Sequence, residues 1–116
     1  MPWNFPYWQA LRFAAPCLMA GNTIVMKPSS VTLQCGLELE KAFLEIGFPE
    51  GAFQTIVGSS ESANHLIDSD VSAVTFTGST KIGASVGQRA ASQLKKCVLE
   101  LGGSDPFIVL DDANVD

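Results

Sequence analysis

The chain has 116 residues, of which 47% are hydrophobic and 16% are charged, and its formal net charge is −5 at pH 7. This composition indicates one globular domain with a hydrophobic core and excludes a disordered tail. The seven Lys and Arg residues are too few and too scattered for a nucleic-acid-binding surface. The longest apolar stretch, residues 11–20, is too short to cross a bilayer, so we expect no membrane partner.

The cysteines Cys17, Cys35 and Cys97 form an odd set without metal-ligand spacing. Each lies among apolar residues, so we expect reduced, buried thiols in a cytoplasmic protein. The first residues lack the basic and apolar regions of a signal peptide. Because the chain starts in an aromatic, proline-rich cluster and stops after an acidic turn, we expect residues 1–116 to be an incomplete domain of a longer protein.

Residues 2–6 predict an aromatic loop in which two prolines restrict the backbone around Asn4. Residues 7–20 predict a helix that is apolar nearly all round and is ended by a Gly-Asn pair. Residues 23–26 predict a short strand that is buried on both faces. Lys27 follows directly after this strand.

The next helix is predicted over residues 31–46, with two serines before it as caps. Residues 53–57 then predict a strand, and a polar turn leads into a short helix that carries His65, which we expect at the surface. The apolar side of the 31–46 helix is expected to consist of Leu33, Leu37, Ala42, Phe43 and Leu44.

Residues 71–77 predict a third strand, after which Gly78-Ser79 opens a helix to about residue 91. The strand that follows carries Glu100, and a Gly-Gly pair leads from it to a final predicted strand over residues 107–110. We expect self-association through the free edge of that final strand and through the apolar 7–20 helix.

This alternation of strands and helices is typical of βαβ units. It predicts an α/β fold of the Rossmann-like, doubly wound type, with a mainly parallel sheet and helices on both faces. In such a sheet, ligands bind at the carboxyl ends of the strands. The residues that follow the predicted strands combine a cation, several glycines, a hydroxyl and an acid, namely Lys27, Gly58, Gly78, Ser79 and Glu100 with the Gly-Gly pair.

Each of these residues also has an ordinary structural interpretation. Lys27 is either a solvated cation or a donor to phosphate or ribose hydroxyls, and we weigh the two equally. The Gly78-Ser79 turn offers free N–H groups to a phosphate, but an ordinary turn between strand and helix has the same pattern. Asn4 is either a turn residue or an amide that stabilises an oxyanion.

Glu100 lies in an apolar strand, whose side chains alternate between two faces. Val98 and Glu100 therefore share one face, while Cys97 and Leu99 share the other. A buried acid at this position is suited to act as a general base. A surface glutamate at a strand end is the alternative, which this segment alone favours.

Four motifs, in order and spacing, resemble the cofactor domain of the aldehyde dehydrogenase superfamily, and together they extend over nearly the whole chain. They are Pro2-Trp3-Asn4-Phe5-Pro6, Lys27-Pro28-Ser29, Phe76-Thr77-Gly78-Ser79 and Leu99-Glu100-Leu101-Gly102-Gly103. The resemblance implies an enzyme that oxidises a small-molecule aldehyde to the acid with NADP or NAD, and we expect a homo-oligomer.

The same resemblance implies two catalytic residues, Asn4 as the oxyanion-hole amide and Glu100 as the general base. Lys27 would hold the adenosine ribose, and Gly58 would let the adenine approach closely. The remaining cofactor contacts would be Gly78 and Ser79 at the pyrophosphate, Leu101 and Gly102 near the nicotinamide, and Trp3.

Two departures from the family pattern stand out. Many NAD-preferring members have a glutamate three residues after the lysine, where this chain has Ser30, and a serine removes the repulsion of a 2′-phosphate. We therefore predict that NADP is accepted. The nucleophilic cysteine of the family lies beyond this chain, so we expect the isolated 116 residues to be inactive.

The segments over residues 1–6 and 95–107 resemble most the succinate-semialdehyde dehydrogenase branch, which makes succinate semialdehyde a candidate substrate. Two alternatives stay open. The first is a truncated, non-catalytic module that binds a nucleotide or only associates, and the second is an α/β fold in which Asn4 and Glu100 are structural. Cofactor binding without reduction would indicate the first, and an absence of cofactor affinity the second.

Overall fold

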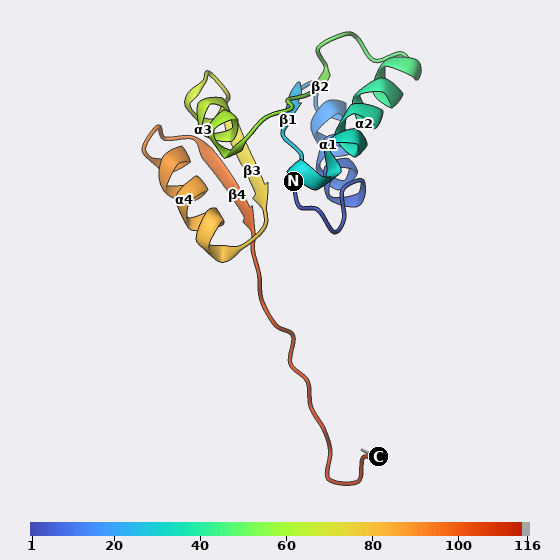
Figure 1. Cartoon of the computed structure of the whole chain (residues 1–116), viewed down its shortest axis with the longest axis vertical. Helices are drawn as coiled ribbons and strands as arrows, with labels where there is room; N and C mark the ends of the chain where they lie inside the picture. The colour runs from blue at the N-terminus through green and yellow to red at the C-terminus, as the bar shows by residue number, and fades with distance from the viewer. Residues whose placement is uncertain (115–116) are drawn as a thin grey trace.

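The computed structural model describes residues 1–114, in which helices and strands alternate along the chain (Figure 1). The order confirms the α/β class. The elements are α1 (Trp8–Met19), β1 (Ile24–Met26), a 3-10 turn (Ser30–Thr32), α2 (Leu33–Glu45), β2 (Phe53–Thr55), α3 (Ser60–Asp68), β3 (Ala73–Thr77), α4 (Thr80–Ala91) and β4 (Lys96–Glu100).

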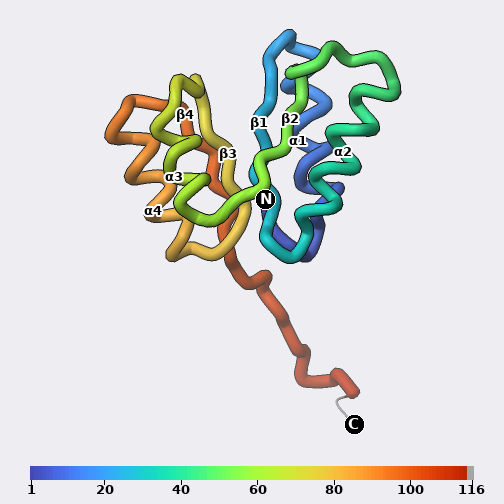
Figure 2. Tube along the Cα trace, turned by 45° about the horizontal axis from the view of Figure 1, so that its top comes forward, coloured from blue at the N-terminus to red at the C-terminus, as the bar shows by residue number. Residues whose placement is uncertain are grey.

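The strands form two parallel pairs rather than the single sheet that the sequence predicts. β1 pairs with β2, with Ile24 opposite Phe53, and β3 pairs with β4, with Thr77 opposite Glu100. Helices α1 and α2 lie against the first pair, and α3 and α4 lie on the far side of the second pair (Figures 1 and 2). The parallel arrangement expected of βαβ units is therefore present, but β1 and β3 do not join in one ladder.

The larger core lies between α1, β1, α2 and β2. In α1 the buried residues Ala10, Ala14 and Leu18 follow each other at intervals of four, which places them on one stripe of the helix. The full cluster is Ala10, Ala14, Leu18, Ile24, Met26, Leu39 and Phe53. Among the described residues of the second half, only Ile67 and Ala90 are buried hydrophobics. The second half therefore depends more on polar contacts.

The sequence overestimates how much of the first half is buried. Helix α1 buries only one stripe, so Trp8 and Met19 are 62% and 88% exposed. Strand β1 is not buried on both faces, because Val25 between its two buried neighbours is exposed. These apolar surfaces have no covering element within residues 1–114.

The predicted apolar side of α2 is partly wrong. Leu37, Ala42 and Leu44 are exposed, whereas Leu39 and Phe43 turn toward the core. The inward face follows Gly36, Leu39 and Phe43, whose spacing of three and four residues matches the helical repeat. The Phe43 ring stacks on Phe53 of β2 at 4.8 Å between ring centroids.

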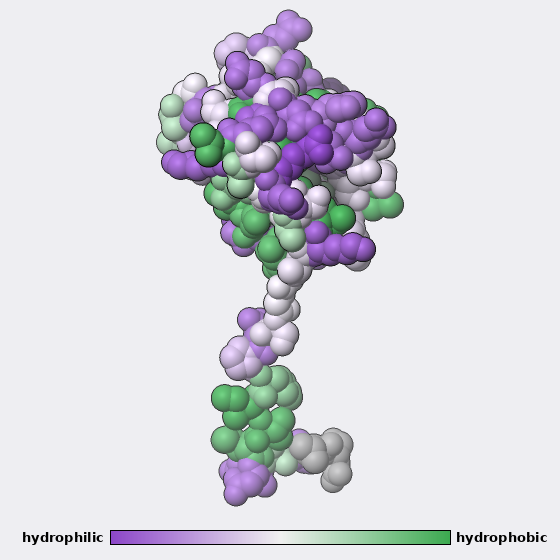
Figure 3. All heavy atoms as spheres, turned by 90° about the vertical axis from the view of Figure 1, so that its left-hand side faces the viewer, coloured by the Kyte–Doolittle hydropathy of each residue, from purple (hydrophilic) through white to green (hydrophobic). Residues whose placement is uncertain are grey.

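Residues 107–110 form no strand, so that prediction is wrong. A strand needs a neighbouring strand to accept and donate its backbone hydrogen bonds. This segment extends away from the helices and strands and has no pairing partner among the described residues (Figure 1). Its apolar atoms form an exposed group in the space-filling view (Figure 3), made by Phe107, Ile108, Val109 and Leu110.

The cysteines are free, as predicted, but they are half-buried rather than buried. His65 is exposed, which confirms its surface position. Within residues 1–114, no helix has the length and apolar character needed to cross a membrane.

Candidate functional site

Strand β4 presents Glu100 at its carboxyl end. The carbonyl of Glu100 accepts a hydrogen bond from the Gly78 N–H at 3.0 Å, which holds the two strand ends together. Along β4 the side chains alternate as predicted. Leu99 turns toward Gly87 of α4, while Val98 and Glu100 face α1.

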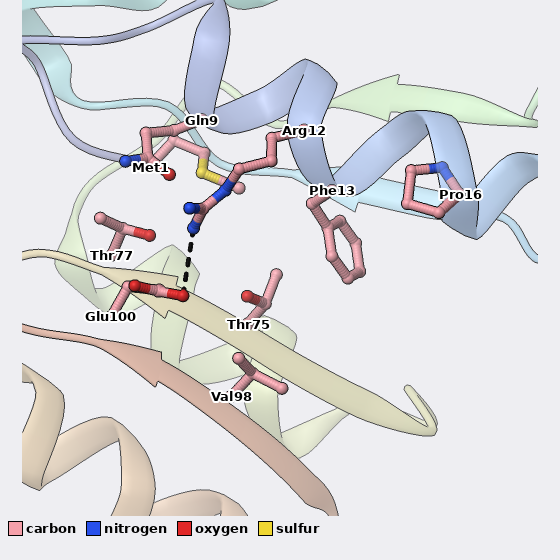
Figure 4. Close-up of a pocket in the computed structure, with 9 residues that line it drawn as sticks. All are labelled: Met1, Gln9, Arg12, Phe13, Pro16, Thr75, Thr77, Val98 and Glu100. Carbon is pink, nitrogen blue, oxygen red and sulfur yellow. Dashed lines mark ion pairs between the residues drawn. The ribbon is translucent and has the colours of Figure 1, made fainter.

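Between α1 and the β3–β4 pair lies a pocket of about 220 Å³ (Figure 4). Its charged groups are Arg12 and Glu100, whose Nη2 and Oε1 atoms form an ion pair at 3.1 Å. The remaining wall is mixed polar and apolar. The lining residues are Met1, Gln9, Arg12, Phe13, Pro16, Thr75, Thr77, Val98 and Glu100.

Glu100 is not a buried acid in this structure. Its side chain is 51% exposed and that of Arg12 is 45% exposed, so both groups keep much of their water. A half-exposed ion pair contributes little to stability, but the carboxylate points toward Arg12 and the pocket. The exposed position agrees with the surface glutamate that this segment alone favours, and the role of Glu100 as a general base stays a prediction.

Arg12 and Gln9 were missed by the sequence analysis. Their positions, with Phe13 and Pro16, repeat at three and four residues and so mark one face of α1 (Figure 4). The signal was present, because Arg12 is the charged residue of an otherwise apolar helix. The Oε1 atom of Gln9 is buried and has no hydrogen-bond partner among the described residues. It is therefore an acceptor that a polar ligand in the pocket can use.

The helix that follows β3 begins with a cap. The Ser79 Oγ accepts a hydrogen bond from the Ile82 N–H at 3.4 Å, which leaves other first-turn N–H groups for an anion. A Cβ at Gly78 would lie 2.6 Å from the Phe76 ring, so a side chain there would require that ring to move. Glycine at position 78 is thus favoured by the space around it, and Ser79 by its capping hydrogen bond.

Gly58 lies in the turn between β2 and α3, and Ser59 after it caps α3 by accepting from the Glu61 N–H at 3.1 Å. A Cβ at Gly58 would lie 2.3 Å from the Ser62 Oγ. The need for glycine here therefore includes room for Ser62, in addition to the predicted approach of an adenine ring.

Lys27 follows β1 and lies at the same edge as Glu100. Its carbonyl accepts from the Met1 nitrogen at 2.9 Å, and Met1 lines the pocket that contains Glu100. The Lys27 Nζ donates to the Pro28 carbonyl at 2.9 Å. Ser30 begins the 3-10 turn three residues later and is exposed.

The other predicted site residues are exposed. Asn4 and Trp3 lie in the loop before α1, outside the wall of the pocket. Leu101 and Gly102 follow β4, and a Cβ at Gly102 would meet only the Thr80 Oγ1 at 3.9 Å. Their roles stay predictions.

The thiols do not act as a nucleophile for this pocket, because none of them lines it. Cys97 lies on β4 next to Val98 and so on the face away from Glu100. Burial raises the pKa of the Cys97 thiol, which favours the unreactive protonated form. Within residues 1–114, no three His, Cys, Asp or Glu side chains come together as a metal site.

Comparison with known proteins places the whole chain in one family. The model of the aldehyde dehydrogenase family matches residues 1–116. A probable NADP(+) succinate-semialdehyde dehydrogenase of Synechocystis sp. is 55% identical over 100% of this chain and 26% of its own length. The NAD(P)+ succinate semialdehyde dehydrogenase Sad of Escherichia coli is 44% identical over 100% of this chain and 25% of its own length.

Among solved structures, the succinic semialdehyde dehydrogenase of Streptococcus pyogenes in complex with NADP+ superimposes with a TM-score of 0.90. It is 40% identical, and the match covers 97% of this chain and 25% of the solved one. The chain therefore spans about a quarter of the length of the curated relatives that it matches.

Proposed function

The chain belongs to the aldehyde dehydrogenase family, and from this premise we propose that it supplies the cofactor-binding region and two catalytic groups of an aldehyde-oxidising enzyme. The observation that carries the proposal is the placement of Lys27, the capped start of α4 at Ser79, and the Arg12–Glu100 pocket at the carboxyl ends of parallel strands. This is the edge at which doubly wound folds bind their ligands.

The donors at this edge fit a phosphorylated dinucleotide. An ammonium group at Lys27 and a hydroxyl at Ser30 suit the adenosine ribose and a 2′-phosphate, and the start of α4 at Ser79 suits a pyrophosphate. Gly58 would allow the adenine to approach, with Trp3, Gly78, Leu101 and Gly102 as the remaining contacts. NADP is the expected cofactor because Ser30 brings no negative charge, and NAD is the alternative.

When bound, the cofactor supplies the acceptor for a hydride from the aldehyde carbon. The chain's own residues would assist the attack on that carbon in two ways. Glu100, which Arg12 orients into the pocket, would take a proton from the attacking thiol or water. The Asn4 amide would donate a hydrogen bond to the oxyanion. The nucleophile itself is not among Cys17, Cys35 and Cys97, so we assign it to another part of the enzyme.

Succinate semialdehyde is the proposed substrate. The E. coli and S. pyogenes relatives carry that name, and such a substrate has a carboxylate in addition to its aldehyde. Arg12 is the basic residue among those that line the pocket, and its guanidinium fork matches a carboxylate. We propose that the substrate carboxylate competes with Glu100 for Arg12, which frees Glu100 for proton transfer.

Two measurements test the function. Titration of the chain with NADP, followed by calorimetry, should show saturable binding, whereas no affinity for NADP or NAD would refute the cofactor role. In the second, this chain replaces the matching quarter of the Synechocystis relative. Activity of the graft, and its loss on Glu100→Gln, is expected. Cofactor binding by an inactive graft would favour the non-catalytic module instead.

The cofactor preference has its own test. Ser30→Glu places a carboxylate beside the 2′-phosphate and should weaken NADP binding by about tenfold while NAD binding changes little. Ser30→Gln is the matched control, because it has nearly the same size without the charge. An unchanged ratio of the two affinities in Ser30→Glu would refute the assignment of Ser30.

A further inference from the structure

Polar side chains join the C-terminal ends of α3 and α4. The Arg89 guanidinium donates two hydrogen bonds to the Asp68 carboxylate, from Nε to Oδ1 at 2.8 Å and from Nη2 to Oδ2. Gln93 Nε2 donates to the same carboxylate at 2.9 Å. The Lys95 ammonium donates to the Ile67 carbonyl at 2.6 Å and to the Ser69 carbonyl. We call Asp68, Arg89, Gln93 and Lys95 the clasp.

The clasp lies where the two helices bury few hydrophobic side chains. In the described part of this half, Ile67 and Ala90 are the buried hydrophobics, so apolar packing constrains the pair weakly. By contrast, two parallel hydrogen bonds between a guanidinium and a carboxylate fix the distance between the two groups and keep them in one plane. Lys95 adds a link from the loop after α4 to the last carbonyls of α3, which a helix end leaves free.

The two helices run in the same direction (Figure 2), with their C-terminal ends at the clasp. Their first turns therefore lie at the other end, at Ser59 and Ser79. At a rise of about 1.5 Å per residue, Arg89 is roughly 15 Å from the start of α4, and Asp68 is roughly 13 Å from the start of α3. Each helix acts as a stiff rod over this distance.

We propose that the clasp is a positioning element for the cofactor site. By fixing the C-terminal ends of α3 and α4, it sets the spacing between their first turns, which follow Gly58 and Gly78. This inference rests on the proposed function, in which those two turns hold the adenosine and pyrophosphate parts of the cofactor. The four clasp residues lie at the helix ends opposite those turns, so we assign them a positioning role rather than a catalytic one.

The first test needs no cofactor. Hydrogen exchange of the full chain is followed at the amides of Ala63 and Gly83, which close the first turns of α3 and α4 by bonding to the Ser59 and Ser79 carbonyls. Asp68→Asn should speed exchange at both amides about fivefold. Lys41→Gln, which removes an exposed ion pair on α2 with Glu45, is the control and should change neither. Faster exchange confined to residues near the clasp would overturn the proposal.

The second test measures NADP affinity in the same variants at a temperature at which circular dichroism shows each to be folded. Asp68→Asn should weaken binding about fivefold, and Arg89→Lys, which keeps the charge but not the fork, by about twofold. A purely stabilising role would leave the affinity of the folded chain unchanged and would overturn the proposal. Absence of NADP binding by the unmodified chain would refute the proposed function instead, while the exchange result would still decide the effect of the clasp on the first turns.

Discussion

Gly36 in α2 is the residue at which a single methyl group should have the clearest effect. A Cβ there would lie 2.9 Å from the Thr55 Cγ2, 3.0 Å from the Pro28 Cγ and 3.1 Å from the Met26 Cε. Thr55 has little freedom to move, because its hydroxyl donates to the Gly36 carbonyl at 2.8 Å and its N–H donates to Glu40 Oε2 at 2.7 Å. The proline ring is rigid as well.

Two opposing effects set the size of the change in Gly36→Ala. Replacing glycine by alanine inside a helix stabilises by about 1 kcal/mol. Overpacking against atoms that cannot move destabilises by about 1–3 kcal/mol. The Thr55 methyl group and the Pro28 ring are such atoms, because each is held in place. We expect a net loss of about 1 kcal/mol in the free energy of unfolding, which lowers the urea midpoint by roughly 0.5 M. Urea denaturation followed by circular dichroism measures it.

The same substitution at Gly87 in α4 is the matched control. Its Cβ would meet only the Leu99 Cδ1, at 3.1 Å, and that half-exposed side chain can rotate away. Gly87→Ala should therefore be neutral or stabilising by up to about 1 kcal/mol. In the double variant, Thr55→Ser removes the clashing methyl, keeps the hydroxyl and should recover part of the loss in Gly36→Ala. Stabilisation by Gly36→Ala alone would refute the reasoning.

Three further predictions concern the loop before β4, β4 itself and the clasp. Leu94 is 96% exposed at a φ of 56°, so Leu94→Gly should raise the free energy of unfolding by about 1 kcal/mol, whereas Leu94→Ala, which keeps the Cβ, should leave it unchanged. Burial raises the pKa of Cys97, so alkylation of this thiol should reach half its maximal rate at a higher pH in the native chain than in urea; equal midpoints would contradict this. The hydrogen bond from Arg89 lowers the pKa of Asp68 below its ordinary 3.8, so this stabilisation is present above about pH 4 and is lost as the pH falls further. Asp68→Asn should accordingly show a shallower loss of stability in acid than the unmodified chain, and parallel curves would argue against the linkage.

The sequence alone was enough to predict the order and type of the elements from α1 to β4, because that information is local. Glycine marks the end of α1 and, with a proline, the end of α2, and short β-branched runs mark β1 and β3. The alternation in β4 was also predictable, so Glu100 and Val98 were correctly placed on one face and Leu99 on the other. The resemblance carried by the four motifs was specific enough to identify the family.

The inward face of α2 and the pairing of strands depend on which elements pack against each other in the folded chain. The inward face of α2 was misjudged, because several stripes of that helix are apolar and only packing against β2 selects the one with Leu39 and Phe43. The strand at residues 107–110 was also wrong, since β-propensity forms a strand only where a neighbour satisfies the backbone.

Long-range polar contacts were beyond reach of local patterns. Arg12 and Glu100 are far apart in the chain, and so are Asp68 and Arg89, yet each pair forms an ion pair in the structure. The sequence by itself therefore determined the α/β class, the chain order of the site residues and the family. The tertiary structure decided that Glu100 is half-exposed beside Arg12 and that α3 and α4 are joined at one end, because charge pairing depends on distances in space that residue types alone do not fix.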